Sequence, residues 1–148
     1  IASNAFNYCD SLKSIVVKKG NPVYDSRDNC NAIIHTETDS LILGCKNTTI
    51  PESVVSIGSY AFSGCSGFDG TLTLSANLTS LGSYAFSGCS GLTSITIPDS
   101  VTTIGDSAFS RCDSLTGIWV SEDNSAYNGD EYGVLYNKEK NVSKKGEL

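Results

Sequence analysis

The sequence of 148 residues predicts a mainly β solenoid in which short strands alternate with short helical turns. The dipeptide Ala-Phe, followed by Cys four residues after the Ala, recurs at Ala5, Ala61, Ala85 and Ala108. The last three copies follow one another at intervals of 24 and 23 residues. Between them, apolar residues alternate with Ser and Thr, which is typical of strands that bury one face. Such a repeat buries its apolar side only against neighbouring copies, so the prediction is a stack of coils.

Each repeat is expected to begin with a strand, and the clearest example is Leu92–Ile97. Its apolar residues alternate with Ser and Thr, which favours a half-buried strand. Pro98 lacks a backbone donor and is expected to end this strand at a corner. Val101 and Ile104 then predict a second short extended stretch.

The repeat is expected to close with a tight bend and one turn of helix. Gly105 permits the bend, because glycine adopts backbone angles that other residues avoid. Asp106 or Ser107 is expected to cap the helical turn. The turn is expected to bury three side chains, those of Ala108, Phe109 and Cys112.

The interval of 56 residues between the first two Ala-Phe copies contains an insertion. A strand is expected over Leu12–Val17, as in the other repeats. Residues 21–44 then predict a β-hairpin, because the apolar runs Ala32–His35 and Leu41–Leu43 flank a polar turn.

Residues 121–144 predict a second, truncated copy of this insertion. Its features recur at Asn124, Tyr127 and Gly133–Asn137, but no return strand comparable to Leu41–Leu43 follows.

Together these elements predict one domain over residues 1–144. Residues 145–148 are typical of the start of an expression-tag linker and are excluded from the domain. The sequence contains no Met, which indicates that it is a piece of a longer protein.

The repeat pattern L-x-x-I-x-I-P-x-x-V-x-x-I-G-x-x-A-F-x-x-C resembles the BspA-like subtype of leucine-rich repeats. The resemblance covers roughly residues 1–17 and 45–120, and the insertion pattern N-x-x-Y…V-L-Y-N extends it to almost the whole chain. It implies a right-handed leucine-rich-repeat superhelix of about five coils with inserted hairpins. The regular Asn ladder of other leucine-rich repeats is absent, and an extra residue in Phe68–Leu72 predicts a small bulge.

The six cysteines divide into four that follow the repeat and two that flank the first insertion. Stacked coils would align the first group as a ladder of buried thiols, at Cys9, Cys65, Cys89 and Cys112. No C-x-x-C pair occurs, so no zinc site or other metal site is predicted. A disulfide between Cys30 and Cys45 stays an open alternative to packed thiols.

Composition excludes several classes of function. The net charge of −6 and the absence of a basic patch argue against binding to nucleic acid or to an anionic membrane surface. No apolar run approaches the length of about 18 residues that a membrane helix requires. The 23 Ser and 12 Thr residues indicate a surface rich in uncharged hydroxyl groups.

No enzyme and no cofactor is predicted. His35 is the single histidine and has no nucleophile signature near it, which makes histidine-dependent catalysis improbable. Paired carboxylates of the kind that a carbohydrate-active enzyme uses occur at Glu122/Asp123 and Asp130/Glu131, but both pairs lie in loops of the second insertion.

The outward positions of the predicted strands form the candidate binding surface, on the concave face of the solenoid. Aligned coil by coil, they are Val16, Thr49, Thr73, Thr96 and Trp119. Trp119 is the residue best suited to anchor a partner, because tryptophan is enriched among energetically important interface residues. The alternative for Trp119 is packing against the second insertion or a further coil.

The resemblance implies a cell-surface or secreted protein of host-associated bacteria or some protozoa, with adhesion to host matrix proteins or cells as its role. The predicted function is therefore non-catalytic binding of a protein ligand, without membrane insertion of these residues. A structural spacer that presents another domain is the rival interpretation, and a carbohydrate-active enzyme is a more distant one.

Overall fold

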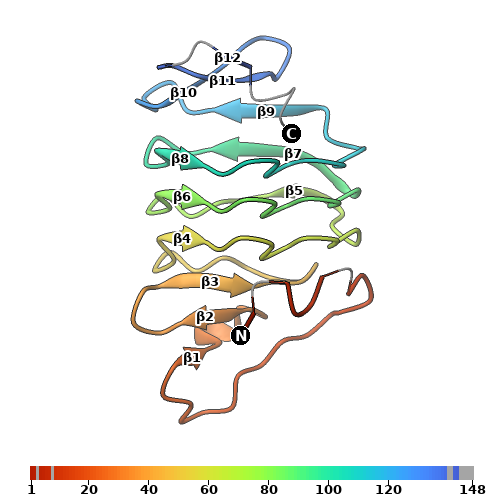
Figure 1. The fold of residues 1–148 in the computed structure, drawn as a ribbon, viewed down its shortest axis with the longest axis vertical. Coiled ribbons are helices and arrows are strands. Elements are labelled where there is room, and N and C mark those ends of the chain that lie inside the picture. Colours follow the sequence, from red (N-terminus) through yellow and green to blue (C-terminus); the bar gives the residue numbers. More distant parts are fainter. Residues whose placement is uncertain (3, 8, 140–141, 144–148) are drawn as a thin grey trace.

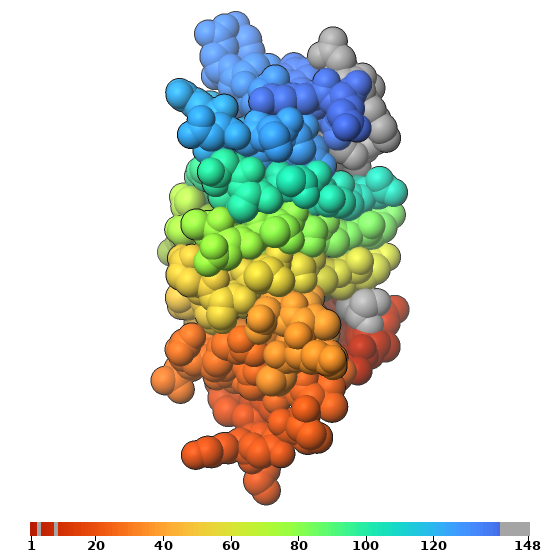
Figure 2. Space-filling view, turned by 90° about the vertical axis from the view of Figure 1, so that its left-hand side faces the viewer, coloured from red at the N-terminus to blue at the C-terminus, as the bar shows by residue number. Residues whose placement is uncertain are grey.

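The computed structural model describes residues 1–2, 4–7, 9–139 and 142–143. The chain is mainly β, and its successive turns lie one above another (Figure 1). The space-filling view shows the repeats as layers that follow one another from the N-terminal to the C-terminal end (Figure 2). Within the described residues, the single helical element is the short 3-10 helix η1 (Arg27–Asn29).

The larger sheet has six strands and combines the first insertion with the repeats. Its insertion strands pair antiparallel, whereas β3, β4, β6 and β8 pair parallel, with one strand contributed by each successive turn of the chain. In sheet order the strands are β1 (Tyr24–Asp25), β2 (Ile33–His35), β3 (Ser40–Leu43), β4 (Ser56–Ile57), β6 (Ser80–Leu81) and β8 (Thr103–Ile104). The hairpin expected in the first insertion and the second extended stretch expected in each repeat are thus confirmed.

The second sheet contains the main strands of three repeats, all parallel: β5 (Gly70–Leu72), β7 (Leu92–Ile97) and β9 (Gly117–Val120). The prediction for β7 is confirmed with the same bounds. The β5–β7 register shifts between Gly70 and Thr71, and the extra residue of this irregularity, Thr93, lies on β7.

The strand expected over Leu12–Val17 is wrong, because this segment is not a strand in the structure. A strand requires a main-chain ladder with a neighbour. Side chains hold this segment instead: the Val17 N–H donates to Ser26 Oγ, and Asn47 Nδ2 donates to the Lys13 carbonyl.

The helical turn expected around Ala-Phe is also wrong, and a series of tight turns replaces it. Left-handed backbone angles recur in the three later copies, for example at Tyr84 (φ 57°) and Gly88 (φ 74°), and at Ser107 (φ 52°) and Arg111 (φ 56°). Residues in this region interrupt a right-handed helix. Ser107 therefore shapes the turn and does not cap a helix.

The core is built on a stack of phenylalanine rings inside these turns. Phe62 and Phe86 stack with ring centroids 5.1 Å apart, and Phe86 and Phe109 stack at 5.6 Å. The main chain repeats with them, because the Phe62 N–H donates to the Ala85 carbonyl and the Phe86 N–H to the Ala108 carbonyl, both at 2.8 Å. Phe86 is completely buried between its two neighbours.

The first Ala-Phe-Cys copy does not join this core, which corrects the prediction of a four-membered cysteine ladder. Phe6 is 40% exposed, and Cys9 is exposed as well. Gly44 occupies the position next to the stack, since its N–H donates to the Ala61 carbonyl as Phe62 does to Ala85. A Cβ at Gly44 would overlap the ring of Phe62, so the stack of rings ends there.

The second insertion forms a separate small sheet at the other end of the molecule (Figure 1). It consists of antiparallel strands β10 (Tyr127–Gly129), β11 (Leu135–Asn137) and β12 (Val142–Ser143). The expectation that no return strand follows is therefore wrong, although β12 is only two residues long. Residues 145–148, assigned from the sequence to a tag, lie outside the described residues.

The second insertion is joined to the repeats through two buried side chains. Asn124 Nδ2 donates to the carbonyls of Pro98 (2.7 Å) and Val101 (2.9 Å). The Ile104 N–H donates to the hydroxyl of Tyr127 at 2.8 Å. These contacts satisfy main-chain groups of the preceding turn, so the insertion continues the stack.

Candidate binding surface

Three of the five candidate residues lie in line on one face of the second sheet, called the strand face below. Thr96 is the register partner of Trp119 on the adjacent strand. Thr73 follows Leu72, the partner of Ile95, so Thr73 lies beside Thr96. All three side chains are exposed, which leaves this line accessible to a partner.

The other two candidates lie outside the paired strands. Thr49 is exposed in an extended segment that precedes Ile50, but this segment is not a strand. Val16 is 78% exposed in the unpaired segment near the N-terminus. The repeat pattern predicts that all five residues are aligned. The strand register aligns only Thr73, Thr96 and Trp119, because Val16 and Thr49 lie outside the paired strands.

Trp119 is 45% exposed and lies against its own strand. A Cβ at Gly117 would be 3.1 Å from Trp119 Cζ2 and 3.2 Å from Cε2, which places the indole over this glycine. Because glycine has no side chain, one part of the indole ring packs directly against the main chain at Gly117. The rest of the ring is open to solvent, as an interface anchor requires.

A groove lies between Thr49 and Thr73 that the sequence does not predict. It has a volume of about 370 Å³ and separates the segment Thr48–Ile50 from β5 and the residues after it. Its lining consists of Thr48, Thr49, Ile50, Glu52, Thr71, Leu72, Thr73, Leu74 and Ser75. The signal that could have indicated it is the 24-residue interval of this repeat, one residue longer than the next.

Hydroxyl groups around the groove are partly committed to the protein itself. Thr48 Oγ1 donates to the Asn31 carbonyl at 2.6 Å, which fixes one wall. Thr71 and Ser94 share a hydrogen bond of 3.0 Å across the strands. The exposed hydroxyls of Thr49 and Thr73 have no partner among the hydrogen bonds of the described residues, so both can face a ligand.

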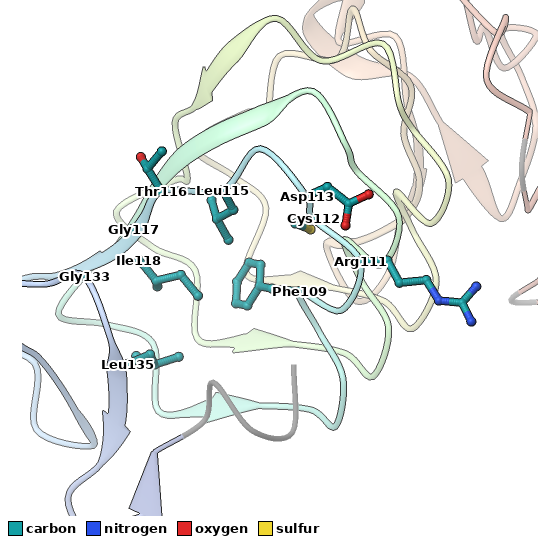
Figure 3. A pocket seen from close by; sticks show the side chains of 10 residues that line it. All are labelled: Phe109, Arg111, Cys112, Asp113, Leu115, Thr116, Gly117, Ile118, Gly133 and Leu135. Atoms are coloured by element: carbon teal, nitrogen blue, oxygen red, sulfur yellow. The ribbon is translucent and has the colours of Figure 1, made fainter.

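A second hollow lies where the phenylalanine stack ends, beyond Phe109 (Figure 3). It has a volume of about 190 Å³ and lies between the last repeat and the second insertion. Figure 3 shows Phe109, Ile118 and Leu135 pointing into it, whereas Arg111 points away. The lining therefore combines apolar side chains with two charged residues, Arg111 and Asp113.

The carboxylates considered for catalysis differ in their surroundings. Glu122 and Asp123 are exposed. Asp130 Oδ1 accepts the N–H groups of Tyr132 and Val134, and Asp130 Oδ2 accepts the Tyr136 hydroxyl. This set of bonds shapes a turn, so it assigns Asp130 a structural role.

Four titratable groups make contacts within the first insertion: Asp25, Arg27, His35 and Asp39. Arg27 pairs with Asp25 at 2.7 Å and also with Asp39, which joins the insertion strands. The hydrogen bond from the Arg27 guanidinium lowers the pKa of Asp25 to about 2. His35 packs edge-on against Tyr24, with centroids 5.7 Å apart, and its Nδ1 contacts Thr38 Oγ1.

All six cysteines are free thiols, so the structure contains no Cys30–Cys45 disulfide. Burial raises the pKa of Cys65 to about 12 and that of Cys112 to about 11. Protonated thiols are poor nucleophiles and poor metal ligands. Over the described part of the chain, no group of three or more His, Cys, Asp and Glu side chains could hold a metal ion.

The parallel strands, the ring stack and the repeated turns define a leucine-rich-repeat protein. The family of BspA type leucine rich repeat regions matches residues 41–132 in six copies. The chain belongs to this family. The match includes the turns that form the core and all three strands of the strand face.

Two solved structures with TM-scores above 0.5 agree with the fold, and a third is similar over most of this chain. A leucine-rich repeat protein from Eubacterium ventriosum is 38% identical over 60% of this chain and 23% of its own, with a TM-score of 0.53. The pneumococcal vaccine antigen PcpA is 17% identical over 75% of this chain and 34% of its own, with a TM-score of 0.51. A leucine rich cell surface protein from Faecalibacterium prausnitzii is 26% identical over 92% of this chain and 39% of its own, with a TM-score of 0.45.

The chain therefore spans between about a quarter and two fifths of the length of these solved proteins. No curated protein matches it.

Proposed function

We propose that the chain is a non-catalytic binding module of a cell-surface or secreted leucine-rich-repeat protein. Its ligand is a protein, of the host extracellular matrix or a cell surface, and the strand face contacts it. The exposed Trp119, in line with Thr96 and Thr73, is the observation that carries this proposal. Thr49 and Val16 extend the proposed surface toward the N-terminal end.

Family membership supports the proposal, because leucine-rich-repeat domains generally bind proteins and are generally not enzymes. The proposed architecture is a right-handed superhelix of about five coils in one domain, with the strand face on its concave side. Among the described residues, no helix is long and apolar enough to cross a membrane.

Substitution of the proposed anchor tests the function. Trp119→Ala is expected to weaken binding to a panel of purified matrix proteins (collagens, laminin, fibronectin) by at least about tenfold, as for a central interface aromatic. The change in Tm is expected to be small, because the indole is half exposed. Binding is measured by biolayer interferometry and Tm by circular dichroism.

Tyr132→Ala is the matched control, since Tyr132 is an aromatic residue that is 74% exposed but lies outside the strand face. It is expected to leave binding unchanged. A Trp119→Ala protein that loses stability but keeps its binding would refute the anchor. A wild-type protein that binds no member of the panel or of a broader set of host-cell surfaces would favour the structural spacer.

A further inference from the structure

The groove beside Thr73 is bounded on one side by the open edge of a β-sheet. β5 is the end strand of the sheet β5-β7-β9. The Gly70 N–H donates to the Gly91 carbonyl on the β7 side. Since the main-chain groups of a strand alternate between its two edges, those of Thr71 and Thr73 are directed into the groove. Unpaired groups of this kind are a template for another strand.

The opposite wall offers complementary main-chain groups. The Thr49 N–H donates to the Cys30 carbonyl, away from the groove. The Ile50 N–H has no hydrogen-bond partner among the described residues. In the described chain, no hydrogen bond joins the segment Thr48–Ile50 to β5.

Contacts join the two walls at both ends of the groove. At one end the Lys46 side chain packs against Gly67, where a Cβ would be 2.6 Å from Lys46 Cδ. At the other end Asn77 Nδ2 donates to the Glu52 carbonyl at 2.9 Å, and Ser75 Oγ contacts Glu52 Oε2 at 3.3 Å. The two walls are thus held at a set separation, so the open strand edge is already formed before a ligand arrives.

We infer that this groove binds an extended, basic segment of a partner protein, which pairs its main chain with β5. The inference rests on the proposed function and specifies how the strand face holds its ligand. A peptide backbone supplies the alternating donors and acceptors that match Thr71 and Thr73. Glu52 is exposed at one end, and the chain carries a net charge of −6, so a Lys or Arg in the segment is favoured.

The dimensions agree with a short segment. The groove volume of about 370 Å³ lies at the lower end of the range of about 300–1,000 Å³ for ligand sites. The walls Thr48–Ile50 and Thr71–Ser75 are three and five residues long. The occupant is therefore a strand of about three to five residues, which lies within the usual range of strand lengths.

A phage-displayed library of random, cysteine-free octapeptides provides the probe. Selection on the protein is expected to enrich peptides that contain Lys or Arg and alternate in polarity. Synthetic forms of the enriched peptides are then measured by fluorescence anisotropy. Replacement of the basic residue by Glu, or N-methylation of alternate peptide bonds, is expected to weaken binding by at least about tenfold.

Matched variants locate the binding site. Thr49→Trp fills the groove, whereas Thr103→Trp adds the same side chain to the exposed side of β8 in the other sheet, outside the proposed binding surface. Glu52→Lys reverses the charge at the groove, and Asp99→Lys does so at the equivalent position after the next Pro. Only the first variant of each pair is expected to weaken peptide binding, by at least about tenfold.

Hydrogen exchange at the amides of Thr71 and Thr73 is expected to slow when the peptide binds.

Three outcomes would overturn the inference. They are a selection that enriches no peptide, peptides that bind Thr49→Trp as well as wild type, and N-methylated peptides that bind unchanged. Loss of peptide binding in Thr96→Trp but not in Thr49→Trp would refute the groove and support the wider strand face. Binding of matrix proteins that depends on Trp119 but not on Thr49 would likewise leave the proposed function intact while refuting the groove.

Discussion

The same Ala-Phe-Cys motif has two different environments in this molecule. In the copy at Ala85 the phenylalanine is completely buried between two other rings, and Cys89 is buried beside it. In the first copy Phe6 is 40% exposed and Cys9 is exposed. The motif therefore does not determine burial by itself. A second copy must stack on it, as expected of units that form a core only in an array.

The two insertions differ in the same way. Asn124 and Asn21 each accept two main-chain N–H groups through Oδ1, at 2.8 Å and 2.9 Å respectively. Asn124 is 1% exposed because its Nδ2 also binds the turn below, whereas Asn21 is exposed. The local turn is thus encoded twice, but the long-range bonds of the asparagine side chain form only at Asn124.

The largest difference in stability between two equivalent positions is expected for the phenylalanines of the buried and the exposed copy. Phe86→Ala is expected to lower the free energy of unfolding by about 3–5 kcal/mol, because it removes two ring contacts and leaves a cavity. Phe6→Ala is expected to lower it by less than about 1 kcal/mol, since the ring is already partly in water. Urea unfolding followed by circular dichroism measures both values. Equal losses in the two variants would show that the first copy also contributes to the core.

A smaller difference in stability is expected between the equivalent asparagines of the two insertions. Asn124→Ala is expected to cost about 2–3 kcal/mol, because the carbonyls of Pro98 and Val101 lose their donor while buried. Asn21→Ala is expected to cost less than about 1 kcal/mol, because water replaces its bonds. The same unfolding experiment compares them. A neutral Asn124→Ala would mean that the second insertion is not coupled to the repeat below it.

Much of the fold is predictable from the sequence, because the repeat makes each element recur. The bounds of β7 follow from the alternation in Leu92–Ile97, and the shared phase of the phenylalanines predicts their stacking. The tight turns were not predictable in the same way. Tyr84 and Ser107 adopt left-handed angles, which their side chains do not favour in isolation. The inter-repeat bonds, such as that from the Tyr84 N–H to the Asp106 carbonyl, hold them there.

One part of the candidate binding surface is likewise predictable from the sequence, and another part is not. The alignment of Thr73, Thr96 and Trp119 follows from the repeat, since equal phase places residues side by side on parallel strands. The groove depends on how far Thr48–Ile50 lies from β5, and that separation results from contacts made by Lys46 and Glu52 at its ends. Binding at either place stays a prediction.

The central claim is that position in the stack, and not the motif, decides whether a repeat is closed to solvent. Alkylation of the native protein by iodoacetamide at pH 8, followed by mass spectrometry, compares the copies in one sample. Cys9 is expected to react at least about 100-fold faster than Cys65 and Cys89, because the latter two react only after local opening. Burial also raises the pKa of Cys65 to about 12, which lowers its thiolate fraction. Rates for Cys9 and Cys89 that agree within a few-fold would contradict the account.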